Sequence, residues 1–284
     1  MLGGKNKHRP QGYTIVEVMV VLAVSGMMFL LAANFINGRQ ARTAFTEGVN
    51  TMASNLQDLI AQVQAGKYSD ADLNCLFDGS SISFPNAEST QTQGTNSACV
   101  FLGKIMYFSY DTSNPDSSYE IFTLAGGRVD SNGNAFTSPN AAFATVVTNP
   151  DLTARTVTPQ NLTVSYVKAY DSGGVAHNTY GLGFFQNPAL DVGGQVASGG
   201  VETINLYYLS PKLSAANNNE TNARAEINPG GGGTLNTAKS ADICLTDGAR
   251  HADVLVGAPS FISSGGGNSL VVNVKMDDTK PCSG

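Results

Sequence analysis

The chain turns from polar to apolar across Gly12-Tyr13-Thr14-Ile15-Val16-Glu17-Val18, and Glu17 is the residue there that most needs an explanation. These seven residues join a short basic leader to an apolar run that ends near Ile36. An acidic side chain near the centre of a membrane helix costs roughly 2.5–3.5 kcal/mol, and such a residue is usually functional and paired. Glu17 is therefore a candidate functional residue.

The apolar run from Tyr13 to Ile36 is long enough to cross a bilayer. As a helix it would measure about 36 Å at 1.5 Å per residue, against a hydrocarbon core of about 30 Å. Lys5, Lys7 and Arg9 precede it. The positive-inside rule therefore predicts a cytoplasmic N-terminus.

Two ordinary membrane signals explain less of this region. A secretory signal peptide has its small-residue cleavage site after the apolar stretch, whereas Gly12 lies before it. A plain signal anchor accounts for the basic leader and the length of the run. It gives no reason for Gly12 or Glu17.

The region resembles the N-termini of the type IV pilin-like proteins, which include pilins, minor pilins and secretion-system pseudopilins. That family has a short basic leader ending in Gly, an aromatic first mature residue, Glu as the fifth and then an apolar helix. Gly12, Tyr13, Glu17 and residues 18–36 match this pattern, with Tyr13 in place of the usual Phe. The resemblance covers about the first sixty residues. It implies that a prepilin peptidase cuts between Gly12 and Tyr13 and that the new Tyr13 amine is N-methylated.

The expected cut also supplies a partner for Glu17. A free amine at Tyr13 has an ordinary pKa of about 7.7–8.0 and is mostly cationic at neutral pH. Within one subunit the two groups lie at i and i+4, which allows a weak pair. In a filament, the resemblance implies that Glu17 meets the Tyr13 amine of a neighbour, where a buried pair would fix register.

Beyond the apolar run, the pattern predicts that the helix continues. Apolar residues recur at spacings of three and four between Phe45 and Val63, as in an amphipathic helix, and Gly66 is a stop signal. An independent coiled coil is the alternative for this half. The expected parts are a removed leader (1–12), a transmembrane helix (13–36), an amphipathic extension (37–66) and a β-rich extracytoplasmic head with disulfide loops (67–284).

The remainder of the chain is predicted to be rich in strands and loops. The expected strands share β-branched or aromatic residues and are punctuated by Gly and Asn, and they cover residues 99–110, 119–124, 143–148, 162–170, 180–185, 201–209, 241–245 and 270–276. The polar residues 210–240 suggest a mobile surface excursion. The predicted fold class is α+β and pilin-like, a long N-terminal helix packed on a head of antiparallel sheet.

Four cysteines lie beyond the membrane segment, at Cys75, Cys99, Cys244 and Cys282. An oxidising exterior favours disulfides over free thiols or a metal site. Four cysteines allow three pairings. The resemblance implies the local pairs, Cys75 with Cys99 and Cys244 with Cys282.

The sequence contains no nucleophile or metal signature, so we expect no enzyme, cofactor or metal. Asp247, His251 and Asp253 form the nearest approach to a cluster, and their spacing fits a polar loop beside a strand better than a triad. Asp277 and Asp278 lack the spacing of a calcium loop and fit solvated turn residues.

Charge argues against broad nucleic-acid binding. The chain has 16 basic and 22 acidic residues, and removal of Lys5, Lys7 and Arg9 leaves 13 against 22, a formal charge of −9. Nucleic-acid binding draws much of its affinity from neutralised phosphates. An acidic head is poorly suited to it.

The expected function is a subunit of a type IV pilus or similar filament, in which a minor or tip pilin fits at least as well as a major one. A type II secretion pseudopilin, or a membrane-anchored surface-binding protein that never polymerises, is the alternative. The expected partners are prepilin peptidase, other pilin subunits and an inner-membrane assembly platform. The protein would begin as a single-pass inner-membrane protein, with its N-terminus cytoplasmic and its head extracytoplasmic. It would then be extracted into a filament, which is either a fimbrium on the bacterial surface or a periplasmic filament.

Overall fold

The computed structural model divides the chain into two compact units, Met1–Ala44 and Phe45–Gly284. The residues that it describes are 14–66, 75–84, 99–111, 114–130, 132–134, 136, 138–147, 155–157, 162–186, 204–210, 220–228, 233–257 and 270–277.

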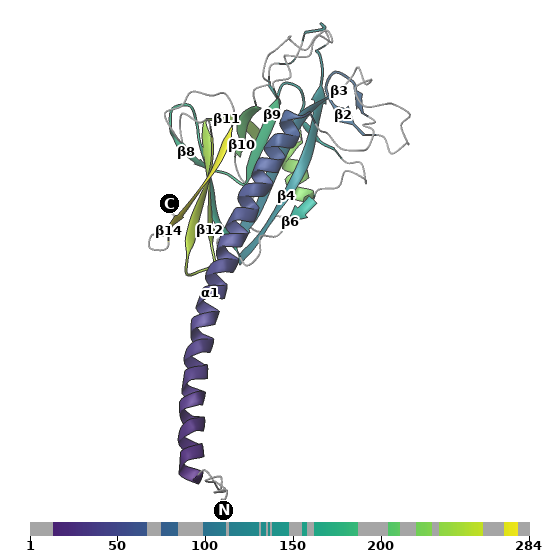
Figure 1. Cartoon of the computed structure of the whole chain (residues 1–284). Helices are drawn as coiled ribbons and strands as arrows, with labels where there is room; N and C mark the ends of the chain where they lie inside the picture. The colour runs from purple at the N-terminus through teal and green to yellow at the C-terminus, as the bar shows by residue number, and fades with distance from the viewer. Residues whose placement is uncertain are drawn as a thin grey trace, which may run out of the picture. The chain divides into compact units, whose positions relative to one another are not determined.

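One long helix, α1 (Ile15–Gln64), belongs to both units (Figure 1). It is continuous through Gly26 and Asn34, so the predicted extension beyond the apolar run is confirmed. Gly66 follows the helix with φ +59°, and its N–H donates to Val63 O over 3.0 Å. A glycine in this left-handed conformation is a common helix stop because it has no Cβ to clash.

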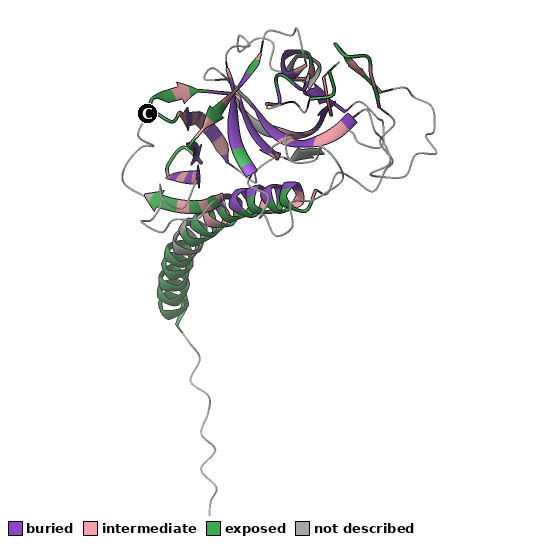
Figure 2. Cartoon of the chain, turned by 90° about the horizontal axis from the view of Figure 1, so that it is seen from above, coloured by how far each residue is buried: buried purple, intermediate pink, exposed green. Residues whose placement is uncertain are grey.

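Residues 45–64 of α1 form the expected amphipathic half. The residues of the predicted apolar stripe are all buried, namely Phe45, Val49, Met52, Leu56, Leu59, Ile60 and Val63. Figure 2 shows their buried positions along the side of the helix that meets the sheets. Because this stripe lies in the core of the head, the coiled-coil alternative is wrong.

Polar contacts also join this half of α1 to the head. The Asn55 amide donates to the Tyr119 hydroxyl over 2.7 Å, and Gln186 donates to Val63 O over 2.6 Å. The Lys104 ammonium donates to the Gln62 side chain. These hydrogen bonds hold this half of α1 on the head in addition to the contacts of its apolar stripe.

The largest sheet has seven antiparallel strands in the order β11-β10-β9-β3-β4-β5, with β6 also paired to β4. Its strands are β3 (Cys99–Asp111), β4 (Asn114–Gly127), β5 (Thr145–Val146), β6 (Arg155–Val157), β9 (Gly181–Gln186), β10 (Ile204–Ser210) and β11 (Thr234–Ala238).

A second antiparallel sheet has five strands in the order β14-β13-β12-β7-β8, and a short pair joins β1 to β2. The bounds are β1 (Leu76–Phe77), β2 (Ile82–Ser83), β7 (Thr163–Tyr170), β8 (Ala176–Asn178), β12 (Ser240–Thr246), β13 (His251–Gly257) and β14 (Val271–Asp277).

The core has two main layers. The first joins the buried stripe of α1 to residues of both large sheets, including Phe184 and Val254. The second lies on the other face of the seven-stranded sheet, where a short helix, α2 (Glu220–Ile227), covers Phe122 and Leu235 through Ile227. The fold class is therefore α+β with antiparallel sheets, as predicted.

The expected mobile excursion at residues 210–240 is wrong where the structure describes it. This segment contains α2 and β11, and β11 pairs with β10 from Ser210 to Leu206. The two elements bury Ile227 and Leu235. One large apolar residue per element carries no periodic signal, which is why the sequence did not reveal them.

Two strands also differ from expectation. The polar loop expected around His251 and Asp253 is instead β13, because the alternating residues Ala252 and Val254 enter the core. The strand expected at 143–148 shortens to β5, because Phe143 has φ 55°, outside the range of a strand.

We expect Leu56→Ala to destabilise the head strongly. Leu56 is fully buried where α1 meets both sheets, and Leu→Ala at such a site costs about 2–5 kcal/mol. The exposed Leu76 is the matched control, for which Leu76→Ala should change stability by less than about 0.5 kcal/mol. Chemical unfolding of the full chain in detergent, followed by near-UV circular dichroism, measures both. Equal effects would contradict the assigned burial.

Candidate functional site

The N-terminal part of α1 presents an apolar surface that no described residue covers. Over the 18 residues Ile15–Ala32 the mean hydropathy is 2.5 and none of the segment is buried. The exposed fraction of its large apolar residues ranges from 47% at Val18 to 79% at Ile15. A surface of this size needs lipid or other helices around it, so the segment fits a membrane anchor.

Glu17 lies in the first turn of this apolar segment and is exposed. Within the described part of the chain, the structure shows no ion pair for its carboxylate. The helix N-terminus itself favours a negative charge by about 0.3–1 kcal/mol. Gly12 and Tyr13, the expected cutting and methylation positions, lie outside the described residues.

Thr14 is a residue of this site that the sequence reasoning missed. The Glu17 N–H donates to Thr14 Oγ1 over 3.3 Å and to Thr14 O over 3.1 Å. Thr14 therefore caps the helix, and the order Thr-x-x-Glu is the capping-box signature that could have revealed it. The helix thus begins at Ile15, directly after its cap Thr14, and Glu17 lies in its first turn.

Two of the four candidate cysteines form a bond in the head. Cys75, directly before β1, is joined to Cys99 at the start of β3, with 6.2 Å between their Cα atoms. This is one of the two local pairs that the resemblance implies. Cys244 on β12 is also disulfide-bonded. Cys282 lies outside the described residues, and its bond to Cys244 stays a prediction.

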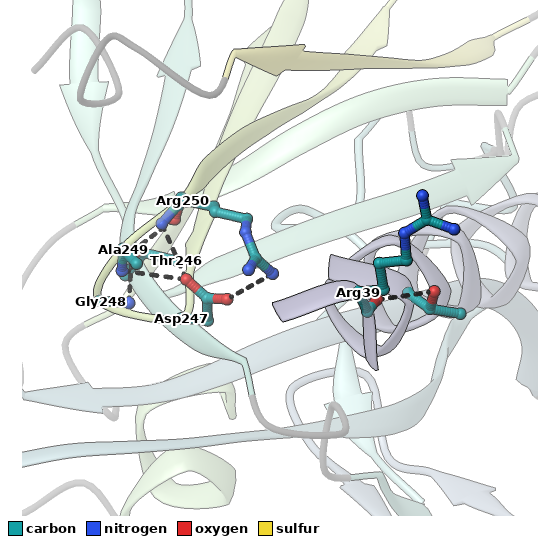
Figure 3. A network of polar contacts seen from close by, with 7 residues as sticks. Arg39, Thr246, Asp247, Gly248, Ala249 and Arg250 are labelled. Carbon is teal, nitrogen blue, oxygen red and sulfur yellow. Dashed lines mark hydrogen bonds and ion pairs between the residues drawn. The ribbon is translucent and has the colours of Figure 1, made fainter. Parts of the chain in front are cut away.

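The polar residues that came nearest to a catalytic cluster are divided between a turn and a strand. Asp247 lies in the β12–β13 turn, where it accepts the backbone N–H of Arg250 over 2.8 Å and pairs with its guanidinium over 3.3 Å (Figure 3). His251 and Asp253 lie on β13. Asp247 therefore builds the hairpin turn.

A metal centre finds no support in the described ranges, which bring no three His, Cys, Asp or Glu side chains together. Asp277 ends β14, and Asp278 lies outside those ranges.

Comparison with known proteins agrees with the N-terminal assignment. The sequence profile of the prokaryotic N-terminal methylation motif matches residues 7–33. No curated protein and no solved structure matches the chain.

The chain thus carries a prepilin-type methylation motif on a hydrophobic N-terminal helix, consistent with a type IV pilin-like protein or pseudopilin. The motif implies processing by prepilin peptidase and assembly with other pilins. It points to a structural filament subunit rather than an enzyme.

We predict that Thr14→Val frays the first turn of α1, because valine cannot accept the Glu17 N–H. Loss of an N-cap costs about 0.5–2 kcal/mol, so the amides of Glu17 and Val18 should exchange several-fold faster. Thr14→Ser keeps the hydroxyl and should restore protection. Amide exchange measured by NMR in detergent micelles separates the variants, and equal rates in both would contradict the cap.

Proposed function

We propose that this chain is a subunit of a type IV pilus or pilus-like filament, assembled through its N-terminal helix. The observation that carries the proposal is the methylation motif over residues 7–33, which leads into a helix whose apolar surface no described residue covers. A membrane covers that surface before assembly, and neighbouring helices cover it afterwards.

Cleavage between Gly12 and Tyr13 would prepare the helix for its transfer from lipid to a bundle of neighbouring helices. It removes the basic leader and creates a cationic amine one turn before Glu17. In the water-poor centre of a helix bundle, a carboxylate without a cation is costly. Pairing Glu17 with the Tyr13 amine of a neighbour therefore sets how far one helix slides along the next.

The proposed topology places the head outside the cytoplasm. Residues 13–36 span the inner membrane, and the head displays its sheets on the filament surface. The disulfides at Cys75–Cys99 and Cys244 support this location, because such bonds persist in oxidising compartments. The large head suits a minor or tip subunit at least as well as a repeating one. Its partners are prepilin peptidase, the other pilins and the assembly platform of the inner membrane.

We expect Glu17→Ala to abolish filament assembly without preventing membrane insertion. Removing one member of a buried ion pair costs about 3–5 kcal/mol, so the yield of sheared filaments should fall by more than about tenfold. Glu17→Gln, which keeps the shape and loses the charge, should behave alike. Immunoblots of membrane and sheared fractions give both quantities.

Glu47→Ala provides the matched control, because Glu47 is an exposed glutamate on the same helix. It should leave the yield unchanged. Normal filament yield from Glu17→Ala would overturn the proposal and favour an anchored surface-binding protein. Where the yield does fall, deletion of the gene separates a pilus subunit, whose loss removes surface filaments, from a secretion pseudopilin, whose loss retains proteins inside the cell.

A further inference from the structure

A group of ionisable side chains occupies the face of the five-stranded sheet that points away from α1. Along β12, Ala241, Ile243 and Leu245 enter the core shared with α1, so the alternate residues Asp242 and Cys244 lie on the opposite face. We call the group on that face the acid cluster, which consists of Tyr166, Lys168 and Tyr170 on β7, Asp242 on β12, Asp253 on β13 and Lys275 on β14.

Strand register places two carboxylates next to one another in the acid cluster. Asp242 lies opposite Leu255 of β13, and Asp253 lies opposite Cys244 of β12. Asp242 and Asp253 are therefore diagonal neighbours on one face, a relation that brings Cα atoms within about 7–8 Å. On the outer sides, Lys168 faces Asp242 and Lys275 faces Asp253.

The Asp242 carboxylate is buried with little compensation. Its residue is only 5% exposed. Oδ2 accepts the Tyr166 hydroxyl over a long 3.4 Å, and Oδ1 has no hydrogen-bond partner in the described structure. The Lys168 ammonium lies 4.7 Å from the centre of the Tyr166 ring, and no ion pair joins it to Asp242. A charge at Asp242 is thus both desolvated and close to a second acid.

We propose that the acid cluster is a proton-responsive device, in which proton uptake at Asp242 tightens the pairing of β12 with β7 and β13 and proton loss loosens it. The protonated carboxyl removes one charge from the buried pair. It can also donate a hydrogen bond, which the carboxylate cannot.

The direction of the response follows from the groups around Asp242. Burial, and then the charge of Asp253, raise its pKa from 3.8 to about 6, while Tyr166, Lys168 and Lys275 lower it by less. The folded sheet therefore binds this proton more tightly than an opened sheet does. Stability from this group is fully present below about pH 4 and declines as pH rises through about 6.

The two tyrosines of the acid cluster are neutral throughout the response. Burial and the two carboxylates raise the pKa of Tyr166 and of Tyr170, so both phenols stay neutral. His251 lies further along β13 on the same face, opposite Thr246. The test must therefore change this second ionisable side chain separately from Asp242.

Hydrogen exchange of the full chain in detergent, at pH 5 and pH 7.5 and corrected for intrinsic rates, tests the device. With the pKa falling from about 6 to 3.8 on opening, β12 and β13 amides should be protected about tenfold more at pH 5. Asp242→Asn should remove this difference and keep high protection at both values. His251→Gln should retain it.

Asp58→Asn is the control for a change of charge, since Asp58 is exposed on α1 and outside the acid cluster. It should leave the tenfold difference in amide protection between pH 5 and pH 7.5, the pH step, unchanged. Asp253→Asn should move the pH step to lower pH, because it removes the second charge. This variant provides the test where Asp242→Asn fails to fold. Three results would each overturn the proposal: no step in the unaltered chain, the same step in Asp242→Asn, or an equal step in β3 and β4 of the other sheet.

Discussion

The segment Ile15–Ala32 has an apolar surface and a single ionisable residue, Glu17, and no residue that the structure describes covers it. Full burial of each large apolar side chain is worth about 1.5–3 kcal/mol, so the segment needs a surrounding of lipid or of similar helices. Glu17 is the exception within that surface. Lipid cannot satisfy its charge, whereas a bundle of processed chains brings one cationic amine for each carboxylate. The same constraint thus fits a membrane anchor and, under the proposed function, would favour packing with the helices of other processed subunits.

The helix that contains this apolar segment continues into the head. The boundary between the two units falls between Ala44 and Phe45, inside α1, where the buried stripe begins. Residues 45–64 supply the centre of the head core, between residues of both sheets. Both units therefore contribute residues to one helix.

The sequence predicted the elements whose burial is periodic. The spacing from Phe45 to Val63 identified the second half of α1, and β-branched or aromatic runs identified strands such as β3, β7 and β14. It missed the short elements α2 and β11, which bury little apolar surface, and it also missed β13, whose burial does alternate. Strand β13 alternates Ala and Val with His251 and Asp253, and these two polar residues led to the prediction of a loop.

At the candidate site, the sequence revealed Glu17 because a charge in an apolar helix is expensive. It concealed Thr14, whose role depends on a backbone hydrogen bond at the helix start. The pairing of Asp242 with Asp253 depends on strand register, which no local pattern encodes. Residue types thus predicted the class of protein. Contacts between residues on neighbouring strands could be identified only from the structure.

The central claim is that this helix is cut at its cytoplasmic edge and then packed into a filament. Mass spectrometry of the N-terminal peptide, taken from filaments sheared off intact cells, tests it most directly. The account predicts a mature chain that begins at an N-methylated Tyr13 and retains the whole apolar run. A chain that keeps residues 1–12, or one that begins after the apolar run, would contradict it.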